Sequence, residues 1–179
     1  MTLVAGAAAG LVVHESGHVL AGWAFSAAPG VKSIHYAGVP FFAVTHDHVP
    51  RRKEFVISSA GFWTQHAGSE LLLTRYPQLR RQGPALARGV LLFDLATSLL
   101  YTGGAVGRLG PPEGDALGMS NSLGAHGWPG PVVGAFILAP ALFDGVRYFA
   151  PGHRWATWGS RGSKLTFMAL TVFAGSSRP

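Results

Sequence analysis

The sequence predicts an all-α integral membrane protein. We expect one membrane-embedded domain, residues 1–179, with a bundle of four to five transmembrane helices and a short β-hairpin or re-entrant loop after the first helix. Charged residues make up only 12% of the chain and hydrophobic residues 48%, whereas a soluble domain carries roughly 25% charged residues. The charges also gather in three segments, 32–54, 75–88 and 147–164, and long apolar stretches separate them. This distribution is typical of a multi-pass protein of a bacterial-type cell membrane.

Five apolar segments are candidates for membrane spans, each of which needs about 20 helical residues. They are Leu3–Phe25, Phe55–Leu73, Gly89–Val106, Gly130–Phe149 and the shorter Ser163–Ala174. The last segment crosses only if it tilts or ends early, so the number of spans stays at four to five. Trp155 and Trp158 precede it and suit the aromatic belt of a membrane interface.

The connections between these segments are predicted from their turn and strand formers. Pro and Gly interrupt residues 26–50, where Val31–Tyr36 and Val39–Thr45 are rich enough in β-formers to pair as a hairpin. Arg75–Pro84 is expected to be a polar turn. A Gly/Pro-rich break over Arg108–Pro129 is expected to enclose a short helix from Ala116 to Leu123.

The net charge of +6 does not indicate nucleic-acid binding. The basic runs Arg51–Lys53 and Arg80–Arg81 each adjoin an apolar segment, which is typical of Lys/Arg that contacts the lipid bilayer and fixes topology. With five spans, eight Lys/Arg fall on one side and six on the other, which favours a cytosolic N-terminus. The N-terminal segment lacks the basic start of a signal peptide, so we expect it to be retained.

The segment His14-Glu-Ser-Gly-His18 carries the chemistry. Residues four apart share a helix face, so His14 and His18 can direct both imidazoles at one ion, while Glu15 can reach a water molecule beside it. Because the chain has no cysteine, any metal must be held by His and carboxylate groups. The pattern predicts Zn²⁺ as cofactor, which lowers the pKa of its water, and Glu15 as the catalytic base. Three ionisable groups in the most apolar span would be costly without such a role.

A catalytic zinc normally takes three protein ligands, and the third ligand stays open at this point. Asp115 opens the predicted short helix, Asp94 lies early in the third span, and Asp144 lies in the fourth span just before Gly145. His66 and Glu70 are further alternatives.

These motifs resemble the site-2 protease family of intramembrane zinc metalloproteases. That family has a His-Glu-x-x-His helix, then a hairpin, then a helix opening near Ala-Gly-Pro, and finally a Pro-rich break before an Asp ligand. His14–His18, the hairpin around Val39–Val44, and Ser59–Phe62 follow this order, with Phe62 where the family usually has Pro. The resemblance covers most of Leu3–Asp115, and it implies that Asp115 is the third ligand.

Other polar and extended segments are expected to serve the substrate. Val39, Phe41, Phe42 and Val44 are predicted to clamp an extended substrate by strand addition, and Asn121 to donate its amide to the oxyanion. Gln65, His66 and Glu70 are expected either to line a water path or to bond neighbouring helices. The group Thr45–His48 resembles a small metal site, but its histidines lack a rigid spacing and are more typical of a surface loop.

The predicted function is therefore hydrolysis of a peptide bond in a membrane-protein or peptide substrate. Two other functions are compatible with the same residues. A catalytically inactive protease-like scaffold would lack a third ligand. A metal-handling membrane protein would place ionisable groups along a continuous path through several spans.

Overall fold

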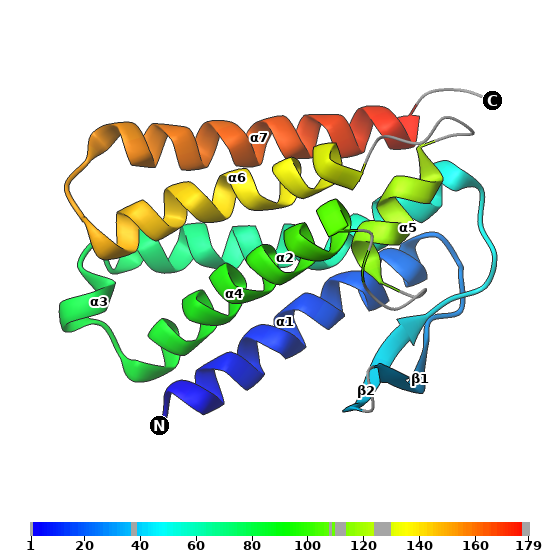
Figure 1. Cartoon of the computed structure of the whole chain (residues 1–179), viewed down its shortest axis with the longest axis horizontal. Helices are drawn as coiled ribbons and strands as arrows, with labels where there is room; N and C mark the ends of the chain where they lie inside the picture. The colour runs from blue at the N-terminus through cyan, green and yellow to red at the C-terminus, as the bar shows by residue number, and fades with distance from the viewer. Residues whose placement is uncertain (1, 37–38, 108, 110–113, 124–129, 177–179) are drawn as a thin grey trace.

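The computed structural model describes residues 2–36, 39–107, 109, 114–123 and 130–176, with the side chains of 36–41 and 174–176 left aside. Two strands and seven helices make up this part of the chain (Figure 1). Their bounds are α1 Leu3–Ala24, β1 Gly30–Tyr36, β2 Val39–Thr45, α2 Arg51–Arg75, α3 Leu79–Gln82, α4 Ala85–Gly107, α5 Asp115–Ser122, α6 Gly130–Phe149 and α7 Arg154–Ser176.

Most of the predicted elements are confirmed. The strands β1 and β2 pair antiparallel, with Val31 opposite Val44, and α5 lies where the short helix was expected. The polar turn contains the single helical turn α3. The prediction of a short last helix was wrong, because α7 begins at Arg154 rather than Ser163. Its first half is polar in sequence, but Ser160 and Lys164 are covered by partners on α2 and α6.

The long helices run side by side along the length of the molecule (Figure 1). The hairpin and α5 lie at one end, whereas α3 and the turn between α6 and α7 lie at the other. Helix α1 packs on α2 and α4, α4 on α6, and α6 on α7. Helix α2 contacts α1, α4, α5, α6 and α7 and is therefore the central helix of the bundle.

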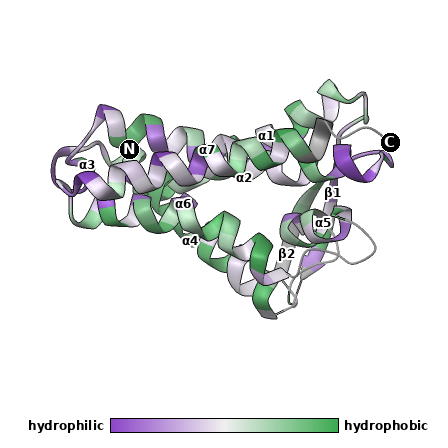
Figure 2. Ribbon diagram, turned by 90° about the horizontal axis from the view of Figure 1, so that it is seen from above, coloured by the Kyte–Doolittle hydropathy of each residue, from purple (hydrophilic) through white to green (hydrophobic). Residues whose placement is uncertain are grey.

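Several polar groups are buried among the apolar core residues of this bundle, and many large apolar side chains are exposed on its outside. His14, Asp94 and Asp144 are buried, whereas Val4 and Trp23 on α1 and Leu100 on α4 are mostly exposed. The most hydrophilic residues lie mainly towards the two ends of the molecule (Figure 2). Three helices, α1, α4 and α6, are long and apolar enough to cross a membrane. The fold is thus mostly helical, with three candidate spans and one small antiparallel sheet.

Small residues allow α1 and α4 to approach each other closely. A Cβ atom added at Gly89 would contact the Leu3 carbonyl oxygen on α1 and lie 2.8 Å from the Gly6 Cα, and a Cβ at Gly6 would meet the Leu86 carbonyl. Backbone therefore faces backbone at this crossing, as at helix–helix contacts in membranes that rely on small residues.

We predict that Gly89→Ala destabilises the protein by about 1–3 kcal/mol, because the added methyl group must push two backbones apart. Gly103→Ala is the matched control on α4, since a Cβ there has no atom within 4 Å, and it should be neutral or stabilising by up to about 1 kcal/mol. Unfolding of the detergent-solubilised variants measures both. Equal stability of the two variants would contradict this account of the crossing.

Candidate metal centre

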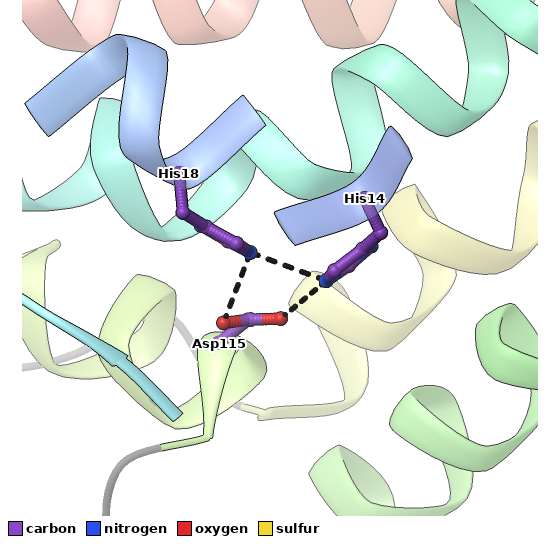
Figure 3. A group of neighbouring side chains, drawn as sticks. All are labelled: His14, His18 and Asp115. Atoms are coloured by element: carbon purple, nitrogen blue, oxygen red, sulfur yellow. Dashed lines mark hydrogen bonds and ion pairs between the residues drawn. The ribbon is translucent and has the colours of Figure 1, made fainter. Parts of the chain in front are cut away.

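Three side chains from two helices converge at one point inside the bundle (Figure 3). His14 and His18 point from one face of α1, and Asp115 reaches them from the first residue of α5. The Nε2 atom of His14 lies 3.1 Å from Nε2 of His18 and 3.0 Å from Oδ2 of Asp115. The Nε2 atom of His18 lies 3.4 Å from Oδ1 of Asp115. Both imidazoles are buried.

The other nitrogen atom of each imidazole faces an acceptor. Nδ1 of His18 lies 2.7 Å from the Ile57 carbonyl oxygen, and Nδ1 of His14 lies against Oε1 of Gln65. A carbonyl or amide oxygen can only accept, so each Nδ1 carries the hydrogen and donates it. In the neutral tautomers, the lone pairs of both Nε2 atoms are then left to face Asp115. Such outer partners are how proteins fix the tautomer and ring orientation of metal-binding histidines.

The spacing of these three groups suits one bound metal ion. Ligand atoms about 2.0–2.1 Å from zinc lie roughly 3.3 Å from one another in a tetrahedron, and the two Nε2 atoms are 3.1 Å apart. The two oxygen atoms of Asp115 divide between them, with Oδ2 3.0 Å from His14 and Oδ1 3.4 Å from His18. One ligand atom from each residue can be chosen so that all three lie within 4.8 Å of one another. When both imidazoles are neutral, their two Nε2 lone pairs and the Asp115 carboxylate face one another with no hydrogen between them. A bound cation would stabilise such a group. Within the described residues this is the one group of His, Asp or Glu side chains with such a geometry.

Asp115 is ionised and remains accessible to water. Burial opposes its ionisation, but protonation of the neighbouring His18 and His14 puts positive charge where a metal ion would lie, outweighs that effect and holds the pKa of Asp115 well below its usual range. Its side chain is 16% exposed, because a cavity of about 210 Å³ opens beside it. Residues of β2, α2 and α5 form the walls of this cavity together with His18.

Glu15 is partly buried next to the three groups, and its carboxylate interacts electrostatically with His14, His18 and Asp115. The His14 ring stacks on Tyr101 of α4 at 6.0 Å and meets Phe62 of α2 edge-on at 5.3 Å. The arrangement therefore has a packed set of possible ligands and, on the same helix, a second carboxylate close enough to interact with them electrostatically.

Glycine residues bring α2 close enough to α1 to serve as the floor of this site. A Cβ atom at Gly61 would collide with the rings of both His14 and His18. One at Gly17 would meet the Ala60 carbonyl, and Thr64 of α2 donates a hydrogen bond of 2.9 Å to the Val13 carbonyl.

Neither Asp94 nor Asp144 belongs to this group. Asp94 accepts hydrogen bonds from Gln65 and Ser69 deeper in the bundle. Asp144 pairs with Arg147 at 3.2 Å and with Lys164 at 2.7 Å. The further alternatives also lie elsewhere, because His66 lies 3.7 Å from Asp94 and Glu70 binds Arg147, Arg161 and Lys164. Of the possible third ligands, Asp115 is the one that the fold brings to His14 and His18.

The predicted substrate-binding residues are only partly gathered at the site. Val44 lines the cavity, and Phe42 is partly buried on β2. The side chains of Val39 and Phe41 fall outside the described part of the chain. Asn121 is exposed on α5 and is not among the residues that line the cavity.

Sequence reasoning missed several residues that shape the site. Gln65 was expected to line a water path or to bond neighbouring helices, and the second alternative is confirmed by its bonds to α1 and α4, but its role as the partner of His14 was not predicted. His46, assigned to a surface loop, lines the cavity and lies 3.4 Å from Glu54. Gly61 belongs to the Ser59–Phe62 segment noted for its resemblance, but its contact with the two imidazoles was not predicted. Tyr101 carried no signal in the sequence, because an aromatic residue in an apolar helix is too common to single out.

We predict that Asp115→Ala abolishes metal binding, with a loss beyond the roughly 10–100-fold typical of removing an outer partner. Asp144→Asn is the control, since it keeps a hydrogen-bonding group for Ser160 and lies in another cluster. Metal content of the two purified variants, measured by mass spectrometry, distinguishes them. Full occupancy in Asp115→Ala would exclude this carboxylate as a ligand.

We also predict that Gly61→Ala lowers metal occupancy sharply, because the methyl group would displace both imidazoles. Gly68→Ala on the same helix should leave occupancy unchanged, since a Cβ there has no neighbour within 4 Å. The same metal measurement applies, with folding checked by circular dichroism. A Gly61→Ala protein with normal metal content would show that α2 does not constrain the rings.

Comparison of the chain with known protein families, curated proteins and solved structures finds no match. The chemistry assigned to the site therefore rests on its own geometry: two imidazoles and a carboxylate at ligand spacing, outer partners that fix the imidazoles, and a second carboxylate beside them.

Proposed function

We propose that this protein is an intramembrane zinc metalloprotease of the site-2 protease type. The observation that carries the proposal is the convergence of His14, His18 and Asp115 beside the carboxylate of Glu15. Its setting gives further support, because the group lies within a bundle whose outer surface is apolar. Three protein ligands that leave one position open are typical of catalytic rather than structural zinc.

In the proposed hydrolysis, the residues around the centre have different roles. When bound here, Zn²⁺ lowers the pKa of a water molecule and polarises the scissile carbonyl group. Glu15 accepts the proton of the attacking water and then delivers it to the amine that leaves. Gln65 and the Ile57 carbonyl hold the two imidazoles in place while this happens. Tyr101, packed on His14, interacts with Asp115 and restricts how the site can rearrange.

The cavity beside Asp115 is the proposed entry for an extended substrate. Val44 and Thr45 of β2 form one wall, and Gly114 and Gly118 of the α5 segment form another. The edge of a two-stranded sheet offers unpaired main-chain groups, so a peptide can add to it as a strand. This placement supports the proposal that β2 presents the substrate to the centre.

We further propose that α2 and α7 cross the membrane together with α1, α4 and α6. Helix α2 is more polar than these helices. Five other helices contact it, so it needs little lipid-facing apolar surface. Helix α7 has exposed Leu165, Met168 and Val172 on its outer side. A five-span bundle places the hairpin opposite α3.

A metal-handling function has one observation in its favour, because buried ionisable groups occur on several helices. They do not form a cation path, however. At the far end of the bundle, Glu70 and Asp144 are matched by three cations, Arg147, Arg161 and Lys164. Two carboxylates under three positive charges repel a metal ion, which favours catalysis at a single fixed site.

We predict that Glu15→Gln retains metal but loses proteolysis by about 10²–10⁴-fold, the usual contribution of a general base. Cleavage of a mixture of fluorescence-quenched peptides in detergent measures activity. Ser16→Ala is the matched control, since its hydroxyl bonds to the Val13 carbonyl of its own helix, and it should cleave like the wild type.

Undiminished cleavage by Glu15→Gln would refute the assigned mechanism. Metal binding by a wild type that cleaves no peptide or membrane-protein substrate would instead favour an inactive scaffold.

We predict that cysteines at Ser33 on β1 and at Gln82 on α3 lie on opposite sides of the membrane, with Gln82→Cys on the same side as Thr2→Cys. The chain has no cysteine of its own, so each variant carries a single thiol. Labelling with an impermeant maleimide in intact cells reports the side. Ser33→Cys and Gln82→Cys on the same side would show that α2 does not cross.

A further inference from the structure

A chain of buried hydrogen bonds leads from the proposed metal ligand His14 to a carboxylate that does not touch the centre. Oε1 of Gln65 faces Nδ1 of His14, and Nε2 of Gln65 donates to Oδ1 of Asp94 at 2.9 Å and to Oγ1 of Thr97 at 2.8 Å. Asp94 and Thr97 are one turn apart on α4, so the NH₂ group of Gln65 is bound by two acceptors on one face of this helix.

The polarity of this network is set by Asp94. As a carboxylate it has no hydrogen to give, and it accepts from Gln65, Ser69 and Ser98. Thr97 donates its own hydrogen to the Phe93 carbonyl at 2.8 Å, so it too can only accept from Gln65. Both hydrogens of the Gln65 amide are therefore directed at α4.

The remaining oxygen atom of Gln65 must then face His14, and an oxygen requires that Nδ1 carry the hydrogen. With the amide turned over, its NH₂ group would face Nδ1, the ring hydrogen would move to Nε2, and the lone pair aimed at the metal would be lost. We propose that Asp94 is a positioning residue for the metal centre, which fixes the tautomer of His14 through the orientation of Gln65. This inference rests on the proposed metal site.

The location of Asp94 fits this role better than a purely packing role. It is 1% exposed in the candidate span α4, where an ionised carboxylate is costly. Two cation-forming groups act on Asp94 electrostatically, His66, whose Nδ1 lies 3.7 Å away, and Lys164. They favour the ionised carboxylate, which is the form that can only accept from Gln65.

The test is a double-mutant cycle on the metal affinity of the apo-protein in detergent, measured by competition with a chelator for Zn²⁺ and by the absorption spectrum of Co²⁺. We expect Asp94→Leu and Gln65→Leu each to weaken binding by about 10–100-fold. Adding Asp94→Leu to Gln65→Leu should cause no further loss, because Asp94 acts only through Gln65. A destabilising effect of Asp94→Leu on packing alone would persist in both backgrounds.

A rescue variant makes the test specific for polarity. In Asp94→Leu/Gln65→Glu both outer oxygens of residue 65 accept, so its orientation no longer matters and binding should return to within a few-fold of the wild type. Thr102→Val is the control, because the Thr102 hydroxyl on α4 donates its hydrogen to the Gly134 carbonyl of α6, outside the network around Gln65. It should bind metal like the wild type.

Wild-type affinity in folded Asp94→Leu, or no recovery in the rescue variant, would overturn the inference. If Asp94→Leu does not fold, Thr97→Val removes the other acceptor of the Gln65 amide with little change in shape. Its metal affinity should fall by a smaller factor, and Gln65→Glu should restore it. An unaltered metal affinity of Thr97→Val would count against the relay, that is, the hydrogen bonds from Asp94 and Thr97 through Gln65 to His14. A wild type that takes up neither metal would overturn the proposed function itself.

Discussion

The close crossing of α1 and α2 is the contact on which the proposed metal centre depends. Gly17 lies against the Ala60 carbonyl, Gly61 lies against both imidazoles, and Thr64 ties the two backbones together. Because no side chain separates the helices, the Ile57 carbonyl can reach His18 and Gln65 can reach His14. A larger residue at either glycine would move the outer partners away from the rings, and the two lone pairs would no longer be aimed at one point.

Inside an apolar bundle, a polar group must find its partner within the protein, since no water replaces a missing hydrogen bond. The same requirement organises two separate groups in the molecule. In one, His14, Gln65 and Asp94 satisfy one another across three helices. In the other, Arg147 binds Asp144 and Glu70. In the first group the neutral imidazole of His14 aims a lone pair at Asp115, as does that of His18, whereas in the second group cations match the carboxylates. This difference separates a site that could hold a metal from a network that joins helices.

Local spacing made part of this structure predictable. His14, Glu15 and His18 share one helical turn, so their common face follows from the sequence alone, and the apolar segments and β-formers predicted most of the elements. The relay could not be predicted, because its bonds join residues 51 and 29 positions apart whose register depends on how α1, α2 and α4 pack. The first half of α7 was missed for the same reason. Ser160 and Lys164 look like loop residues until their partners on α2 and α6 are known.

The depth of the centre follows from helix geometry. Helix α1 has 22 residues and, at about 1.5 Å per residue, is roughly 33 Å long, which places His14 and His18 roughly 16 and 22 Å from its first residue. The centre therefore lies past the midpoint of α1, in the half nearer the hairpin. The cavity beside it is lined by Thr45, His46 and Glu54, so its polar walls lead towards that same end. This cavity gives the partly exposed side chain of Asp115 its contact with solvent. In the proposed function, a peptide strand paired to β2 would reach Glu15 and the proposed metal ligands by extending inwards from the end of the bundle that carries the hairpin.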